Sequence, residues 1–237
     1  MDDIGFEKTL IKQQQQQALS PKDRWENNVS YIQFPGWAKR DPRPILWIGG
    51  RQNKRGVSWV SSFAIDLIEA LDMERGIDTA CVLCSSSRTE KLVTPLNIFK
   101  QIIIQLLMAQ PDIVANPANL KILTIQRFDR AKNSPEAAYS ILTFVLRMID
   151  EAASHKNREI FLIIDRIDLC LARETYDSRT RFLRSLKMLN MEFKTLRLIL
   201  TSQKPTEEMK LPLGGEEQVT EVWIDTTEQA SIYGRGL

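Results

Sequence analysis

The stretch ILWIGGRQNKRGVS, residues 45–58, decides the predicted fold. It begins with a short apolar run, turns at Gly49-Gly50, continues through a polar and basic loop and ends at Ser58. From Val57 to Leu71, apolar residues recur at helical spacing. A buried strand, a loop and an amphipathic helix in this order are the setting in which backbone N–H groups and a helix N-terminus bind phosphates.

Strand and helix patterns alternate through the rest of the chain. The predicted strands cover residues 45–48, 79–84, 160–164, 196–200 and 219–224. The predicted helices cover residues 57–71, 95–110, 135–153 and 178–193, and residues 111–134 are mixed. This alternation predicts an α/β fold, a three-layer, doubly wound and mainly parallel sheet of about five strands. In such sheets ligands bind at the carboxyl ends of the strands.

Four segments are expected along the chain. Residues 1–20 are polar, contain a glutamine run and predict a helical or disordered extension without a core of its own. Residues 21–44 predict a helical and irregular lead-in, residues 45–226 the core, and residues 227–237 a tail.

Composition excludes several classes of function. The net charge is +2, with 43% hydrophobic and 26% charged residues, so no global field favours nucleic acid. No apolar run is long enough for a membrane helix. Cys81 and Cys84 should lie on opposite faces of a strand, which favours buried thiols over a metal site. Reduced thiols predict a cytoplasmic protein.

The first loop departs from the phosphate-binding pattern G-x-x-x-x-G-K-[ST] at its most important position. Gly56 and Ser58 match the end of the pattern, but Val57 stands where lysine is expected. The first glycine of the pattern falls on Arg51, and Gly50 lies one residue too early. The alternative interpretation is a basic surface turn between strand and helix.

A nucleotide, either ATP or GTP with Mg²⁺, is the ligand that this loop predicts, and its binding is expected to be weak or absent. Ser58 offers a hydroxyl to Mg²⁺, and Lys54 or Arg55 offers a positive charge in place of the missing lysine. The candidate nucleotide-binding residues are Gly50, Arg51, Asn53, Lys54, Arg55, Gly56, Ser58 and Thr201.

Two further strands end in polar residues. Asp165 follows the run 160–164, where a carboxylate would contact Mg²⁺ through water, and Ser58 and Asp165 are the candidate metal ligands. Asp168 is the candidate catalytic residue, and its alternative roles are a helix cap or a salt bridge to a nearby arginine. Thr201 follows the next strand and could sense a terminal phosphate, or simply end that strand.

Residues 43–50, 58–63, 160–168 and 198–203 resemble a known family in order and spacing. The chain is similar, over residues 24–225, to fungal NACHT-type domains and nephrocystin-type N-terminal domains. These are P-loop NTPases of the STAND signalling class. The resemblance implies a P-loop NTPase-like fold, nucleotide binding and a larger signalling protein with further C-terminal domains.

Three departures from the family pattern imply impaired hydrolysis. Val57 replaces the phosphate-binding lysine, Leu169 replaces a glutamate that helps to activate water, and Gln203 replaces the arginine of Thr-Ser-Arg. Lysine and glutamate act on charge binding and water positioning respectively, so losing both is costly. The leading hypothesis is a catalytically impaired nucleotide-binding or signalling module. The alternatives are an active ATPase or GTPase with an unusual loop, and a structural fragment that needs a protein partner.

Overall fold

The computed structural model describes only part of the chain, and most of the first loop lies outside that part. The described residues are 9, 44–50, 59–74, 76–84, 93–153, 158–203, 209, 211–213 and 219–224. The predicted N-terminal extension, lead-in and C-terminal tail fall almost entirely outside these ranges, as do residues 51–58.

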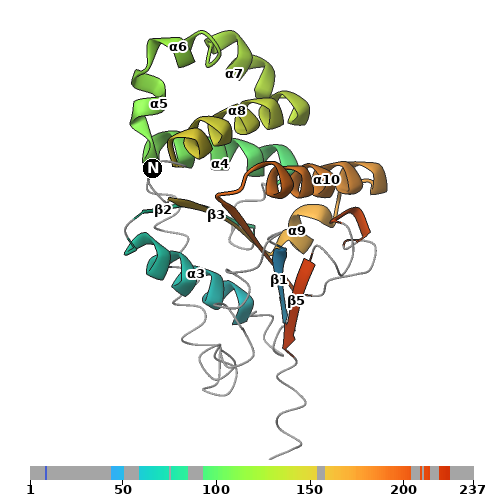
Figure 1. Ribbon diagram of the computed structural model, residues 1–237. Coiled ribbons are helices and arrows are strands. Elements are labelled where there is room, and N and C mark those ends of the chain that lie inside the picture. Colours follow the sequence, from blue (N-terminus) through green and yellow to red (C-terminus); the bar gives the residue numbers. More distant parts are fainter. Residues whose placement is uncertain are drawn as a thin grey trace, which may run out of the picture.

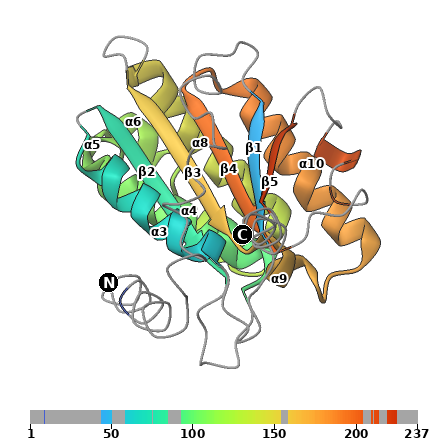
Figure 2. The same cartoon turned by 90° about the horizontal axis from the view of Figure 1, so that it is seen from below.

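Five parallel strands form one sheet in the order β2-β3-β4-β1-β5 (Figure 2). Their bounds are Ile45–Gly50 for β1, Ile77–Leu83 for β2, Glu159–Asp165 for β3, Leu196–Ser202 for β4 and Val219–Ile224 for β5. Every recorded pairing between neighbours is parallel. The predicted number and direction of strands are confirmed.

Helices cover both faces of this sheet (Figure 1). Helix α3, Trp59–Asp72, packs on one face. The opposite face carries α4 (Pro95–Ala109), α8 (Pro135–Ala153), α9 (Ile167–Leu171) and α10 (Tyr176–Glu192). The short helices α5 (Pro111–Ala115), α6 (Pro117–Leu120) and α7 (Ile125–Ala131) lie farther from the sheet, beyond α4 and α8, and a 3-10 turn covers Leu211–Leu213. The predicted three-layer architecture is confirmed.

Two apolar clusters, one on each face, hold the layers together. Alternate residues of strands β1 to β4 enter different clusters, as the period of two requires. In β1, Leu46 and Ile48 face α3, whereas Ile45 and Trp47 enter the larger cluster on the other face. Strand β3 is buried along almost its whole length, as expected of a central parallel strand.

The cysteines follow the same alternation. Cys81 lies in the cluster that faces α3, and Cys84 lies in the cluster on the opposite face. Cys81, Cys84 and Cys170 are all buried. The prediction of buried core thiols is confirmed for all three. None of the helices within the described ranges is long and apolar enough to cross a membrane.

Several predicted boundaries were wrong by one or two residues. Strand β2 begins at Ile77, because Ile77 and Asp78 already pair with Glu159 and Ile160 of β3. Helix α10 begins at Tyr176, because the side chain of Thr175 accepts a hydrogen bond from the backbone of Ser178 and caps the helix.

The mixed segment 111–134 forms three short helices. Pro111 and Pro117 each occupy the first turn of a helix. Proline is tolerated at this position because the missing N–H has no partner inside the helix. Both residues therefore start helices α5 and α6.

Candidate nucleotide-binding site

The strand order brings the predicted loops to one edge of the sheet. Strand β4 lies between β1 and β3, so the carboxyl ends of all three strands are neighbours. Gly49 pairs with Ser202, and Ile164 pairs with Leu200. Gly50 ends β1 opposite Ile224. The end of β1, where the first loop begins, therefore lies at the same edge as Asp165 and Thr201, as the sequence predicted.

Asp165 is fully buried at this edge, with a side chain that accepts hydrogen bonds from two hydroxyls. Its exposed fraction is 0%. Ser61, on the first turns of α3, donates to Oδ2 at 2.9 Å. Thr201, at the end of β4, donates to Oδ1 at 2.5 Å. Because buried polar groups need such partners, these two hydroxyls fix the orientation of the carboxyl group. Asp165 thus connects β3, β4 and the helix that follows the first loop.

The residue after Asp165 has a strained backbone. Arg166 has φ 54° and ψ 48°, and it is the one non-glycine residue with positive φ among those described. This left-handed conformation costs a side chain about 1–2 kcal/mol. It directs the Arg166 backbone N–H to Thr201 Oγ1 at 2.9 Å. Thr201 therefore accepts from Arg166 while it donates to Asp165, and the ends of β3 and β4 are held together.

The Arg166 guanidinium is buried and bound to Asp168. Nε and Nη2 contact the two carboxylate oxygens of Asp168, each at 3.0 Å, and Nη2 also donates to Gln203 Oε1 at 3.2 Å. The exposed fractions of the Arg166 and Asp168 side chains are 4% and 19%. The salt bridge weighed as an alternative for Asp168 is therefore observed. A role of Asp168 in positioning water remains a prediction.

Trp47 and Cys84 complete the edge on the face away from α3. The indole N–H of Trp47, which is fully buried, donates to Ser202 Oγ at 2.7 Å. The backbone N–H of Cys84 donates to the carbonyl of Asp165 at 3.1 Å. Burial raises the pKa of the Cys84 thiol well above its usual value, and the negative charges of Cys170, Asp165 and Asp168 add to this, against an opposing effect of Arg166.

The buried thiols predict a loss of stability at alkaline pH. Burial, with a smaller effect of Glu174, raises the pKa of Cys170 to about 12. In the unfolded chain a thiol ionises near 8.5, so the unfolded state binds fewer protons above that pH. The stability that the protonated Cys170 thiol contributes is complete below about pH 8.5 and is lost as pH rises towards 12, by about 1.4 kcal/mol per pH unit.

Urea unfolding of the parent and of Cys170→Ala at pH 8 and pH 10 checks this expectation. The variant should lose less stability between the two pH values than the parent loses, because it lacks one titrating thiol. Equal losses in the two proteins would contradict the effect of Cys170.

Sequence reasoning missed three contributors to this site. Ser61 follows the candidate metal ligand Ser58 by three residues, a helical spacing that was the available signal. The roles of Arg166 and Cys84 carried no signal in the sequence. The contacts of Arg166 depend on its left-handed backbone angle, and the contact of Cys84 depends on the register of β2 against β3.

The predicted residues divide into two groups. Gly50, Asp165, Asp168 and Thr201 lie at the carboxyl edge of the sheet, where they were expected. The other candidate binding residues fall outside the described residues, namely Arg51, Asn53, Lys54, Arg55, Gly56 and Ser58.

The oxygen-rich surroundings of Asp165 fit Mg²⁺ better than a softer metal. The donors there are one carboxyl group and the hydroxyls of Ser61 and Thr201. Within the described ranges, no group of three or more His, Cys, Asp and Glu residues could hold a metal alone. Mg²⁺ characteristically binds through one or two carboxylates and substrate phosphates, so the donor set suits a metal that arrives with a nucleotide.

This parallel sheet, with a loop-to-helix connection after β1 and a buried aspartate at the end of β3, defines a P-loop NTPase-like domain. The family described as "Nephrocystin 3, N-terminal" matches residues 26–203, about three-quarters of the chain. The chain belongs to that family.

A solved structure shows the same fold class. The chain is similar to the Walker-type ATPase PabY2304 of Pyrococcus abyssi, with 17% identity and a TM-score of 0.52 over 87% of this chain and 56% of that one. It also matches the ORC2 protein of Aeropyrum pernix, solved in ADPNP and ADP complexes, with 12% identity and a TM-score of 0.40 over 81% of this chain and 44% of that one. The chain thus spans about half the length of these structures. No curated protein matches it.

Proposed function

We propose that this chain is a nucleotide-binding but catalytically impaired P-loop NTPase-like domain, which acts as a signalling or interaction module of the NACHT or STAND type. One observation carries the proposal. Asp165 is buried and oriented by Ser61 and Thr201, so the metal side of the site is ordered, whereas both oxygens of Asp168 are bound to Arg166. These contacts therefore support nucleotide binding more than they support hydrolysis.

Binding is assigned to the loop after β1 and to the acid at the end of β3. ATP or GTP would bind with its phosphates against the backbone of the loop and the N-terminus of α3. Ser58 and Asp165 would hold Mg²⁺, which would neutralise phosphate charge, and Thr201 would lie beside the terminal phosphate. The remaining proposed contacts are Gly50, Arg51, Asn53, Lys54, Arg55 and Gly56.

Impaired hydrolysis is supported by the position that should activate water. Asp168 is the acid available there among the described residues near Asp165, and it already forms a bidentate salt bridge. Leu169, at the position of the family's glutamate, packs against the apolar cluster and cannot accept a proton. Val57 removes the ammonium that would bind the phosphates. Each missing charge would raise the barrier by several kcal/mol.

The wider role follows from the family and from the limited span of the match. Residues 45–226 would form the core of a larger cytoplasmic signalling protein, with a protein partner or further domains completing its function. The proposed role of the core is to report nucleotide occupancy rather than to turn nucleotide over.

Calorimetric titration with Mg·ATP and Mg·GTP, followed by a steady-state hydrolysis assay, tests the proposal. We expect saturable binding of one of them that disappears with EDTA, and turnover at least 100-fold below the enzyme median of about 10 s⁻¹. Absence of binding would overturn the assignment as a nucleotide-binding module.

Turnover at an ordinary rate would instead favour an active ATPase or GTPase. Lys54→Ala and Arg55→Ala would then identify the replacement for the missing lysine, since loss of binding in either variant would assign that role.

A further inference from the structure

Arg166 carries a charge that the proposed function does not use. A guanidinium stays protonated at any physiological pH, and a buried charge requires a partner. The Arg166 side chain is 4% exposed. Among the described residues, its one anionic partner is Asp168, and Gln203 adds a neutral acceptor. A single carboxylate, itself 19% exposed, therefore balances this cation.

The backbone of Arg166 is connected to the second acid of the site. Its N–H donates to Thr201 Oγ1, and the Thr201 hydroxyl donates to Asp165. One residue is thus tied to Asp168 through its side chain and to Asp165 through its backbone. The left-handed backbone at this position would suit glycine better, and strained residues of this kind cluster at ligand-binding sites.

The location of Arg166 is compatible with phosphate. It follows β3 directly, and Gln203, which its guanidinium contacts, follows β4, the neighbour of β1. The loop after β1 has Val57 where a lysine would bind phosphate. The planar guanidinium can donate two parallel hydrogen bonds to a phosphate, as it does here to a carboxylate.

We infer that the Arg166 guanidinium binds phosphate in this site. The terminal phosphates of a nucleoside triphosphate compete with the Asp168 carboxylate for it. This inference rests on the proposed function, because it requires a nucleotide at the same edge of the sheet. Phosphate and Asp168 cannot both occupy the same face of the guanidinium, so triphosphate binding displaces the carboxylate. In the nucleotide-bound state, impaired hydrolysis then rests on Val57 and Leu169 rather than on the salt bridge of Asp168.

This competition predicts opposite effects of removing the two partners. Arg166→Gln removes a charge-assisted contact, so Mg·ATP or Mg·GTP should bind about 10-fold more weakly. Asp168→Asn removes the competitor and increases the fraction of Arg166 available to phosphate, so binding should tighten about 5-fold. Arg166→Lys should fall between the parent and Arg166→Gln, since it keeps the charge without the fork. AMP, which lacks the terminal phosphates, should bind these proteins with nearly equal affinity.

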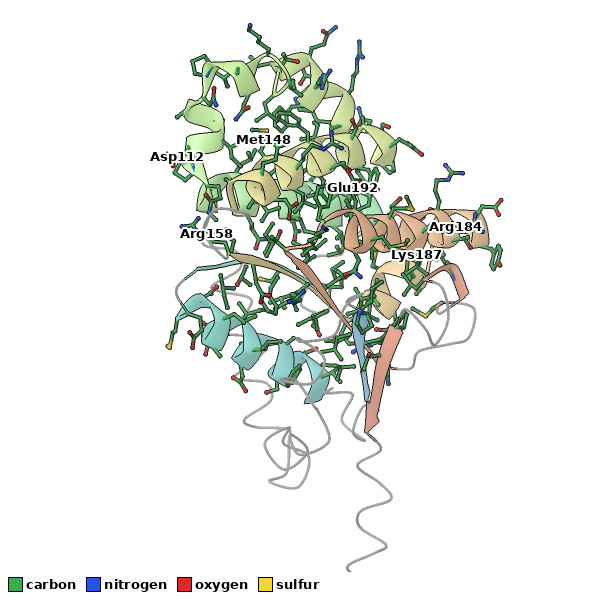
Figure 3. All side chains as sticks on the ribbon, viewed as in Figure 1. Asp112, Met148, Arg158, Arg184, Lys187 and Glu192 are labelled. Atoms are coloured by element: carbon green, nitrogen blue, oxygen red, sulfur yellow. The ribbon has the colours of Figure 1, made fainter. Side chains whose placement is uncertain are left out.

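Calorimetric titration of the parent, Arg166→Gln, Arg166→Lys and Asp168→Asn with Mg·ATP, Mg·GTP and AMP provides the test. Arg184→Gln is the matched control, because Arg184 is an exposed arginine on the outward side of α10 (Figure 3) and its loss should not change binding. Thermal unfolding of each variant accompanies the titrations, because both partners hold the same salt bridge.

Opposite changes in triphosphate affinity support the inference, and changes in the same direction overturn it as a purely structural salt bridge. If Arg166→Gln fails to fold, Asp168→Asn alone decides the test. Weaker triphosphate binding by that variant overturns the inference. A parent that binds no triphosphate refutes the proposed function, and the inference with it. A parent that binds, with unchanged affinity in Arg166→Gln, refutes the inference alone.

Discussion

Replacement of Trp47 by alanine is expected to reduce the free energy of unfolding by about 3–5 kcal/mol. Trp47 lies on β1, between β4 and β5, is 0% exposed and belongs to the larger apolar cluster. The substitution leaves a cavity beside β1, in the larger apolar cluster, and removes the hydrogen bond from the indole to Ser202. Urea unfolding, followed by far-ultraviolet circular dichroism, measures the change.

Two control variants divide this effect into its parts. Trp47→Phe keeps most of the ring volume but leaves the Ser202 hydroxyl without its donor, so we expect a loss of about 1–3 kcal/mol. Met73→Ala changes a side chain that is 85% exposed and should stay within about 0.5 kcal/mol of the parent. A Trp47→Ala protein as stable as the Met73→Ala protein would show that β1 does not pack as described.

Asp165→Asn is expected to weaken Mg²⁺-dependent nucleotide binding by about 100-fold or more while the fold is retained. Even residues that only orient metal ligands contribute about 10- to 100-fold to metal affinity, so a direct or water-mediated ligand should reach the upper end. Asparagine has nearly the same shape as aspartate. Its oxygen can accept from Thr201, and its amide can donate to the Ser61 hydroxyl, which can reverse its role.

The measurement is the difference in affinity with and without Mg²⁺ for the parent and the variant. Asp112→Asn is the control, since Asp112 is an exposed residue of α5, a helix of the layer outside α4 and α8 (Figure 3). Thermal unfolding reports whether the fold survives. Equal Mg²⁺ dependence in the parent and in Asp165→Asn would remove Asp165 from the proposed metal site.

The buried strands and the longer helices were predictable because their signals are local. The run 160–164 is apolar without interruption, which is the pattern of a strand covered on both faces. Helix α8 begins at Pro135 and strand β5 covers Val219–Ile224, both as predicted. Parallel strands also imply that their carboxyl ends share one edge, so the sequence predicts that Asp165 and Thr201 lie near each other.

The contacts within the candidate site could not be predicted, because they depend on strand order and on single backbone angles. The sequence does not reveal that β4 lies between β1 and β3, and only this order brings the Thr201 hydroxyl to Asp165. The salt bridge of Asp168 required the left-handed backbone of Arg166, which sequence patterns do not predict for an arginine.

The position of β1 in the sheet also determines when the site can assemble. Among the described strands, β1 pairs with β4 and β5, and its Trp47 bonds to a residue 155 positions later. Contacts so distant in sequence form slowly, because a long segment must be ordered before they contribute. On the ribosome, the first strand would wait for nearly the whole domain to be synthesised. Nascent chains that end before residue 196 would expose it to chaperones and to aggregation.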